Sequence, residues 1–376
     1  MIETVCAVVA AGGVVFYGLV TVAGLRFCGN PLPGGRDSDV LISLLKPLAG
    51  DEPGLEDNLR SCLRQDCASF EVLFGVRDDG DTAKPVAERL IGRFDGQGEL
   101  LITGEPLVER YPNPKVYQLI ALEKKARGEI LVISDSDIRA EPELVRAIGA
   151  DFEDSQVGVV TYPYRAISGG GVWSLSEAVG MDTEFWGGVL VARMLFGMDF
   201  AVGPTMAIRR SCLNELGGFE AFREYAAEDF EIGQQAREKG WVVELSRHVV
   251  EHHIGSQGFL ANFGHRVRWY RQTRRSRPAG YIAQVFTYPL PFALALVALS
   301  LSWVPLLGAV VVARLAAAVA TIKVLGPRWG PTRWALLFPQ DLASFVVWVL
   351  GFFGKRLNWR GRPYQLTPDG KLKLVG

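Results

Sequence analysis

Apolar residues form long runs near both ends of the chain and only short runs in between. Residues 5–25 carry no charged side chain, and about twenty such residues suffice to cross the roughly 30 Å hydrocarbon core of a bilayer. Residues 285–325 are almost entirely apolar over a length too great for one crossing, and 335–353 are apolar again. The pattern predicts a transmembrane helix at the N-terminus, further membrane segments near the C-terminus, and a different kind of domain between them.

Charges beside the first apolar run indicate how it is oriented. Arg26 follows the run, so the positive-inside rule places the amino terminus outside and the following residues in the cytosol. A cleaved signal peptide is the competing interpretation. It needs a basic leading region, however, and only Glu3 precedes the apolar run.

The C-terminal apolar residues divide near Pro305 into two expected spans, 284–303 and 305–325. Arg314 lies inside the second span, so we expect its side chain to face protein rather than lipid. Basic residues flank 335–353 on both sides, which a single span cannot reconcile with the positive-inside rule. We therefore expect this last segment to be re-entrant or interfacial.

Between the membrane segments, buried-strand patterns alternate with amphipathic helical patterns. The expected strands are 40–46, 70–77, 100–103, 129–134, 157–162, 202–209 and 241–245. The expected helices are 55–63, 83–94, 114–127, 142–152 and 227–239. This alternation predicts an α/β domain with a parallel, doubly wound sheet. Residues 168–202 show no clear hydrophobic period. Their apolar and aromatic side chains fit either packing in the core or an apolar surface that binds a lipid acceptor.

Composition narrows the class of protein. The 376 residues are 49% hydrophobic and carry a formal net charge of -1, which argues against a nucleic-acid-binding protein because such proteins have a basic excess. The five cysteines are an odd number without metal-type spacing. They predict reduced thiols and a cytosolic location for the main domain.

Two carboxylates, Asp135 and Asp137, directly follow the strand expected at 129–134. Ligands of open α/β sheets bind at the carboxyl ends of the strands. Hard divalent cations such as Mg²⁺ use one or two carboxylates together with substrate phosphates. The pair therefore indicates a metal-assisted nucleotide-sugar site. The alternative is an acidic turn, since Asp and Ser are common turn residues.

Three further polar features accompany this pair. Asp229 opens the helix expected at 227–239, where a carboxylate either balances the helix dipole or serves as a general base. His252 and His253 are expected in a loop; adjacent side chains of an extended chain point to opposite sides, so one of them could bind a metal but not both. The basic, aromatic helix that begins at His265 is typical of a membrane surface.

The order of these features resembles the D, D, D, (Q/R)xxRW pattern of membrane-bound GT-A glycosyltransferases. The resemblance is closest to the ceramide glucosyltransferase-like group, glycosyltransferase family 21, and it covers roughly residues 40–290. The segments that carry it are 45–48, 52–59, 74–78, 113–116, 133–139, 203–206, 228–231 and 265–269. It implies a Rossmann-like GT-A fold with terminal transmembrane helices.

The resemblance also implies a role for each matching residue. Asp78 is expected to bind the uridine part of the donor. Asp135 and Asp137 match the DxD position, with Asp137 the more direct metal ligand. Asp229 matches the catalytic base of inverting members, and Lys115 is expected to approach the diphosphate.

Lys46 and the last motif complete the expected site. Lys46, Arg268 and Trp269 are expected on the donor side, and the last motif at the acceptor consists of His265, Arg266, Arg268 and Trp269. Arginines 266, 268 or 271 could stabilise the charge of the departing diphosphate. His265 replaces the glutamine that seats the growing glucan in processive synthases, so we do not expect a processive polymerase.

The expected reaction is an inverting transfer of a sugar, favoured as glucose, from a UDP-sugar to a membrane lipid hydroxyl, favoured as ceramide. Mg²⁺ or Mn²⁺ would stabilise the leaving diphosphate as a Lewis acid. Alternatives are a UDP-N-acetylglucosamine-dependent enzyme acting on hopanoids or polyprenyl phosphate, a polysaccharide synthase, and an inactive lipid-binding membrane protein. The filled aspartate positions argue against the inactive protein.

Together these segments predict a multi-pass integral membrane protein with a cytosolic catalytic domain. If the source is bacterial, the expected location is the inner membrane. The expected parts are an N-terminal transmembrane helix (1–27), a linker (28–39), a GT-A catalytic domain (40–264), an interfacial segment (265–283), C-terminal membrane segments (284–354) and a basic cytosolic tail (355–376). Its expected partners are the UDP-sugar, the lipid acceptor and the bilayer, with no nucleic acid.

Overall fold

A computed structural model describes residues 1–29, 40–50, 52–94, 96–256, 258–326, 329–359 and 362–375, so most of the expected linker 28–39 lies outside the described residues. The chain forms two compact units. The sheet unit comprises Leu32–Tyr164, Met198–Gly255 and Arg356–Gly376. The helical unit comprises Met1–Pro31, Arg165–Gly197 and Ser256–Lys355.

A seven-stranded sheet forms the centre of the sheet unit, in the order β3-β2-β1-β4-β8-β6-β9. Its strands are β1 (Ile42–Pro47), β2 (Phe70–Val76), β3 (Gly98–Ile102), β4 (Ile130–Ser134), β6 (Val157–Thr161), β8 (Thr205–Arg209) and β9 (Val242–Leu245). The first four run parallel, as expected, but β8 is antiparallel to both β4 and β6. The fully parallel sheet was therefore a wrong prediction for β8. A strand buried on both faces has the same apolar pattern in either direction, so the pattern could not reveal the reversal.

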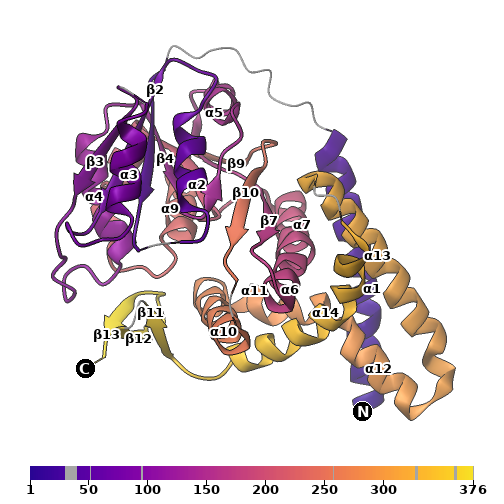
Figure 1. The fold of residues 1–376 in the computed structure, drawn as a ribbon. Helices are drawn as coiled ribbons and strands as arrows, with labels where there is room; N and C mark the ends of the chain where they lie inside the picture. The colour runs from indigo at the N-terminus through magenta and orange to yellow at the C-terminus, as the bar shows by residue number, and fades with distance from the viewer. Residues whose placement is uncertain are drawn as a thin grey trace. The chain divides into compact units, whose positions relative to one another are not determined.

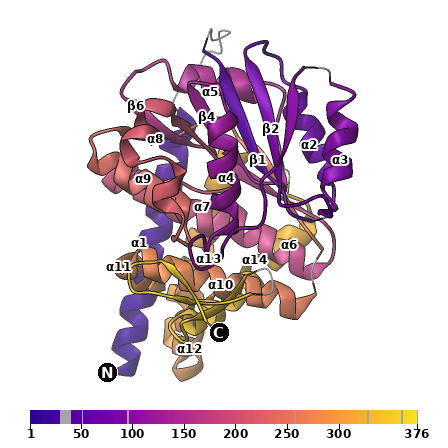
Figure 2. The ribbon, with the colours of Figure 1, turned by 90° about the vertical axis from the view of Figure 1, so that its left-hand side faces the viewer.

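Helices cover both faces of this sheet (Figure 2). They are α2 (Leu55–Leu63), α3 (Lys84–Ile91), α4 (Pro114–Lys125), α5 (Leu144–Asp151), α8 (Arg210–Leu216) and α9 (Glu228–Glu238), with a 3-10 turn at Phe219–Phe222. Gly75 of β2 faces Leu122 of α4. Gly98 of β3, which pairs with Val72, faces α2 and α3 instead, and residues 72 and 75 lie on opposite faces of β2. The parallel half of the sheet is therefore doubly wound.

Short strands complete the sheet unit. β5 (Ile138–Arg139) pairs antiparallel with β10 (Val250–Ile254), so the histidines at 252 and 253 lie in a strand and not in the expected loop. The chain leaves the unit through β7 (Tyr164–Ser168). The expected basic tail folds into an antiparallel sheet of β11 (Arg356–Trp359), β12 (Arg362–Leu366) and β13 (Leu372–Leu374), drawn in yellow in Figure 1.

The helical unit contains α1 (Ile2–Gly29), α6 (Val172–Gly180), α7 (Trp186–Phe196), α10 (Phe259–Ser276), α11 (Pro278–Ala283), α12 (Pro289–Leu299), α13 (Val304–Leu325) and α14 (Pro331–Gly351). A π-helical turn, Met181–Phe185, joins α6 to α7, and 3-10 turns occupy Gln284–Thr287 and Leu301–Trp303. The stretch 168–202, which showed no clear period, is thus largely helical. Its π turn shifts the helical phase and hides the period.

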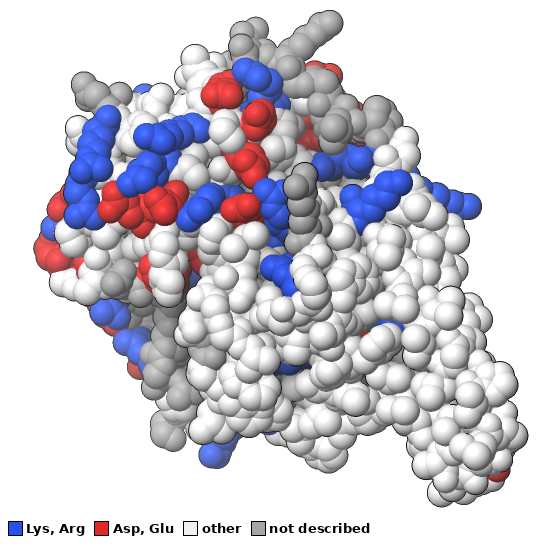
Figure 3. Space-filling model, turned by 45° about the vertical axis from the view of Figure 1, so that its right-hand side comes forward, with Lys and Arg blue, Asp and Glu red and all other residues white. Residues whose placement is uncertain are grey.

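Among the residues that the structure describes, three helices are long and apolar enough to cross a membrane: Ile2–Gly29, Leu301–Leu325 and Pro331–Gly351. The pair Pro278–Thr287 and Pro289–Leu299 also qualifies if it is counted as one span with a 49° bend. The helix α14 is continuous through the segment that was expected to be re-entrant or interfacial. On the face drawn in Figure 3, charged side chains gather over one part of the surface and a broad region is nearly free of them.

Small residues and a buried ion pair connect the long apolar helices. Gly24 of α1 lies against Ala320 of α13, where an added Cβ would be 3.1 Å from the alanine. Arg314 is 2% exposed, and its guanidinium donates to Asp341 of α14 at 2.7 and 2.8 Å. The expectation that Arg314 faces protein is confirmed.

Candidate active site

The loop after β4 carries Asp135 and Asp137 at the carboxyl edge of the parallel strands. Lys46, at the end of the adjacent strand β1, is completely buried. Its ammonium donates to the backbone carbonyls of Asp135 at 2.6 Å and Ile138 at 3.0 Å. Lys46 therefore fixes the backbone of the loop from the buried side. The sequence had led us to expect a contact between Lys46 and the sugar-nucleotide donor instead.

Lys115 joins two acidic segments of the sheet unit. It lies in the first turn of α4, and its ammonium is 2.7 Å from the Asp135 carboxylate and 2.9 Å from that of Glu228. Burial alone would lower the pKa of Lys115, but these carboxylates outweigh burial and raise it. Burial and the nearby Asp137 raise the pKa of Asp135 against the effect of Lys115. The lysine thus stands as a firm positive charge beside the DxD loop.

Asp137 has a different partner, His252 of β10. The register of β5 and β10 sets Ile138 opposite His252, and the His252 Nε2 lies 3.0 Å from the Asp137 carboxylate. His253 turns the other way, toward Glu251 at 2.9 Å. One histidine of the pair thus reaches the acidic loop, as the alternation of the two side chains predicted. Burial opposes ionisation of Asp137, yet the charges of His252 and Lys46 lower its pKa.

The residues of this loop fit a divalent cation. Within the described ranges, no three acidic, histidine or cysteine side chains are already gathered in a metal-binding arrangement. However, the Asp137 Oδ1 is buried and forms no hydrogen bond with any residue that the structure describes. Burial and neighbouring carboxylates also raise the pKa of Asp135, because they disfavour its negative charge. A bound cation would stabilise that charge. Asp137, Asp135 and His252 are the side chains that would hold a metal here.

Asp229 is the second residue of α9 and lies half-buried beside Glu228. Burial and the Glu228 charge raise the pKa of Asp229 to about 7, although Lys115 opposes them. Asp229 therefore begins a helix, but its pKa is not lowered as the helix dipole alone would lower it. A carboxyl with a pKa near neutrality is suited to proton transfer. The loop before β8 presses against it, since a Cβ on Gly203 would lie 2.8 Å from its Oδ2.

Asn113 was not singled out by the sequence analysis, although it belongs to a matching segment. It caps α4, accepting from the amides of Lys115 at 3.0 Å and Val116 at 3.2 Å. Its amide nitrogen donates to the Tyr225 carbonyl at 2.9 Å and to Glu228 at 3.1 Å. An Asn followed by Pro114 at the start of a helix is a recognisable cap signal. The second contact has no local signal because its partners are over a hundred residues away.

Asp78 follows β2 and lies at the same edge of the sheet as the DxD loop. It remains largely accessible, and its carboxylate accepts from Arg77 at 2.7 Å and from the amide of Gly80 at 2.9 Å. The hydrogen bond from Arg77 lowers the pKa of Asp78. The Arg77 guanidinium is also 3.1 Å from Glu105.

The residues of the last motif lie on α10 in the helical unit. The His265 ring is 4.3 Å from that of Trp269, and its Nδ1 is 3.6 Å from Glu177 of α6. Arg266 is buried and donates to Ser344 of α14 at 2.8 Å, so it packs inside the helical unit. Arg268 and Trp269 are half-buried. The structure thus gathers the expected site residues in two groups, one within each unit.

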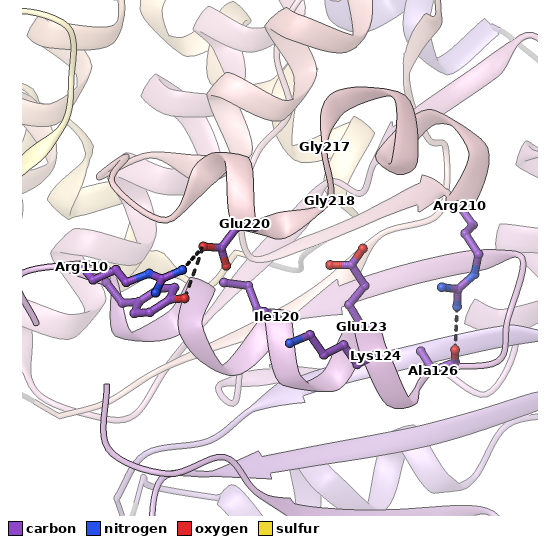
Figure 4. Close-up of a pocket in the computed structure, with 10 residues that line it drawn as sticks. Arg110, Ile120, Glu123, Lys124, Ala126, Arg210, Gly217, Gly218 and Glu220 are labelled. Carbon is purple, nitrogen blue, oxygen red and sulfur yellow. Dashed lines mark hydrogen bonds and ion pairs between the residues drawn. The ribbon is translucent and has the colours of Figure 1, made fainter. Parts of the chain in front are cut away.

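The sheet unit also has a hollow of about 630 Å³ that none of the expected site residues lines (Figure 4). It lies between α4 and the turn at Gly217–Gly218. Two of its charged side chains are bonded to the protein: Arg210 donates to the Ala126 carbonyl at 2.8 Å, and Glu123 accepts from the Phe219 amide at 3.1 Å. Because none of the expected site residues lines the hollow, the DxD edge remains the candidate site.

Comparison with known proteins agrees with this architecture. The family model described as glycosyl transferase family 21 matches residues 5–372. Ceramide glucosyltransferase 1 of Caenorhabditis elegans is 28% identical over 231 residues, covering 61% of this chain and 48% of that protein. Ceramide glucosyltransferase 3 of the same organism is 23% identical over 244 residues, covering 61% and 49%. The alignments thus span about half the length of these relatives.

Among solved structures, the mannosyltransferase PcManGT from Pyrobaculum calidifontis, in complex with GDP-Man and Mn²⁺, has the same GT-A fold. Its TM-score is 0.55 at 18% identity, with 93% of this chain and 99% of that chain covered. The sheet order, the terminal apolar helices and the family match along almost the whole sequence lead to one conclusion. This chain is a member of glycosyl transferase family 21.

Proposed function

We propose that this protein transfers a sugar from a UDP-sugar to the hydroxyl of a membrane lipid, with inversion at the anomeric carbon. The observation that carries the proposal is the arrangement of Lys115 between the DxD loop and the segment of Asp229. A fixed positive charge thereby stands beside both a cation-binding loop and a carboxyl with a pKa of about 7. These are the groups that a diphosphate leaving group and a hydroxyl nucleophile require.

In this proposal the acceptor hydroxyl oxygen attacks the anomeric carbon while its proton passes to the Asp229 carboxylate. The bond from the anomeric carbon to the diphosphate oxygen breaks, and UDP leaves with the bonding electrons. A single displacement of this kind inverts the configuration and gives a β-linked product from an α-linked donor. Glu228 and the buried surroundings keep Asp229 basic enough to accept the proton.

The other residues of the edge act on the donor. In the proposed reaction Asp78 binds the uridine part of the donor. Lys115 binds the diphosphate in exchange for its present carboxylate partners, Asp135 and Glu228. Asp137, Asp135 and His252 would hold Mg²⁺ or Mn²⁺, which when bound stabilises negative charge on the leaving diphosphate. The solved mannosyltransferase of similar fold is itself a complex with GDP-Man and Mn²⁺, which supports a nucleotide-sugar donor.

We propose glucose and ceramide as the favoured donor sugar and acceptor, because the curated relatives are ceramide glucosyltransferases. The helical unit, with three helices suited to cross a membrane, would give the enzyme access to a lipid acceptor in the bilayer. His265, Arg268 and Trp269 of α10 are the proposed acceptor-side residues. The five free cysteines and Arg26, in the last turn of α1, support a cytosolic sheet unit.

The test combines lipid analysis with one variant. Mass spectrometry of lipids from a host that expresses the chain identifies donor sugar and acceptor together, and the expected product is glucosylceramide. A hopanoid or polyprenyl-phosphate product would keep the reaction but replace the acceptor. Asp229→Asn should retain UDP binding and lose transfer by about 10²–10⁴-fold, the range for a general base. Full activity of this variant would remove Asp229 as the base.

A further inference from the structure

The C-terminal sheet, β11 to β13, packs against the segment that leads into the catalytic base. We call residues 223–228 the base segment. The amide of Leu372 donates to the Glu224 carbonyl at 2.7 Å, and the amide of Ala226 donates to the Gly370 carbonyl at 3.1 Å. Tyr225 and Lys371 form an antiparallel bridge between these two bonds. The C-terminal chain therefore extends its sheet along the base segment.

Side chains reinforce this backbone contact. Ala226 is buried in a small apolar cluster with four residues of the C-terminal sheet: Leu357, Tyr364, Leu366 and Leu372. The Lys371 ammonium lies 3.2 Å from the Glu224 carboxylate and 5.4 Å from the centre of the Tyr225 ring. The cluster is separate from the core of the seven-stranded sheet, so its loss need not unfold that core.

The opposite side of the base segment is held by α4. The amide of Asn113 donates to the Arg223 carbonyl at 3.2 Å, and its side chain donates to the Tyr225 carbonyl and to Glu228. The base segment thus lies between a helix cap and the C-terminal sheet. Asp229 comes three residues after Ala226, and α9 already begins at Glu228. A displacement of the base segment would therefore be passed on to Asp229, because few residues lie between them.

The C-terminal sheet also contacts the chain between β3 and α4. Val108 packs on its apolar cluster, and Arg362 pairs with Glu105 at 2.8 Å. Glu105 in turn lies 3.1 Å from Arg77, which neighbours Asp78. Exposed ion pairs of this kind stabilise a fold only weakly, so the backbone bonds and the apolar cluster are the main connection.

We propose that the C-terminal sheet is a brace that positions Asp229 for catalysis. In this role its residues act by fixing the base segment, through the backbone bonds and the apolar cluster, and not by contact with donor or acceptor. The inference rests on the proposed function. A brace of this kind governs the rate of the chemical step, because a base displaced by about 1 Å can cost on the order of 10²-fold. It should have little effect on donor binding, which involves the DxD loop and Asp78.

The first experiment compares Leu372→Ala with Lys373→Ala, its exposed neighbour on the other side of β13. The wild type and both variants, each as the whole chain in lipid nanodiscs, would be compared in three measurements. These are the rate of transfer from UDP-glucose to ceramide, the affinity for UDP, and the hydrogen exchange of residues 223–231. Leu372→Ala should raise exchange there and lower kcat about tenfold or more, with UDP affinity within about twofold of wild type. Lys373→Ala should match wild type in all three.

A second test reverses the charge of Lys371 and then compensates it at Glu224. Lys371→Glu places like charges beside each other and should lower kcat, and adding Glu224→Lys in the same chain should restore it. Thermal unfolding separates the two explanations: equal unfolding temperatures of the single and double variants would show that the rescue acts on kcat and not on stability, and an unchanged kcat in Lys371→Glu would count against the brace.

The outcomes separate the brace from the reaction. Unchanged kcat despite faster exchange of residues 223–231 would overturn the brace, as would an equal loss of kcat and UDP affinity. An inactive wild type would overturn the proposed function instead. In that case unaltered exchange in Leu372→Ala would still reject the brace.

Discussion

At the scale of single residues, the environment of Asp229 determines its chemistry. A helix N-terminus would ordinarily lower the pKa of a carboxyl, because the helix dipole stabilises its negative charge. Burial and the neighbouring Glu228 carboxylate instead raise the pKa of Asp229 to about 7, and Lys115 limits the rise. The side chain therefore changes its charge within the range in which the enzyme would work.

The pH dependence of transfer follows from this pKa. Only the ionised carboxylate accepts a proton, so kcat/KM should fall as the pH decreases through about 7, approaching tenfold per pH unit below it. UDP release measured from pH 5 to 9 with saturating metal would show the acidic limb. A rate that stays constant down to pH 5 would mean that another group, or none, accepts the proton.

Stability offers an independent check of the same pKa. A carboxyl whose folded pKa is raised contributes stability below its unfolded value near 4, and this contribution is lost as the pH rises through about 7. Asp229→Asn has no such loss, so its advantage in unfolding temperature over wild type should widen from pH 5 to pH 8.5. A constant difference would contradict the raised pKa.

Gly203 is a second residue whose importance is steric. A Cβ at this position would lie 2.8 Å from the Asp229 Oδ2, closer than a carbon and an oxygen can approach. Gly203→Ala should displace the carboxylate and lower kcat by about 10–100-fold, with donor affinity retained. Gly92→Ala is the control, because its Cβ would meet its nearest neighbour at an ordinary 3.6 Å. Equal activity of the two variants would contradict the steric argument.

At the scale of elements, α4 and α9 are coupled through one cap residue. Asn113 closes the first turn of α4 with its oxygen and holds the base segment with its nitrogen. A single side chain thus sets the spacing between the lysine that would meet the diphosphate and the proposed base.

The two functions of Asn113 can be separated by substitution. Asn113→Ala removes both and should cost about 0.5–2 kcal/mol of stability from the cap alone. Asn113→Ser keeps a cap oxygen but loses the two donors, so its unfolding temperature should recover while its kcat stays low. Calorimetry and UDP-release assays on both variants would decide. Recovery of kcat in the serine variant would show that the cap is all that matters.

At the scale of the whole molecule, the helical unit keeps a salt bridge within its apolar interior. Arg314 of α13 and Asp341 of α14 are each 2% exposed. The Nε and one Nη of Arg314 donate to the two carboxylate oxygens of Asp341, and Arg314 also donates to Thr183 at 2.9 Å. Two such charges are tolerated because each neutralises the other. The pair links α13 to α14.

Removing one partner should be worse than removing both. Arg314→Met leaves a buried, unpaired carboxyl and should destabilise the protein by about 3–5 kcal/mol. The double variant Arg314→Met, Asp341→Leu should recover most of that loss. Thermal unfolding in detergent micelles provides the measurement, and equal destabilisation of the single and double variants would contradict the role of charge.

The sequence by itself determined the features that local patterns encode. Hydrophobic period and length placed the strands and helices of the sheet unit and the apolar spans, because burial of one face or of a whole segment is written into neighbouring residues. The carboxylates at Asp135, Asp137 and Asp229 were recognisable because strand ends and helix starts are local events. Family membership followed from the same ordered motifs.

Only the tertiary structure decided which distant groups meet. The reversal of β8, the internal use of Lys46, the contact of His252 with Asp137, and the packing of the C-terminal sheet on the base segment all join residues far apart in the chain. Such contacts depend on sheet order and register, which neither composition nor period specifies. The pKa of Asp229 belongs to this group too, because the burial and charges that raise it come from separate segments brought together by the fold.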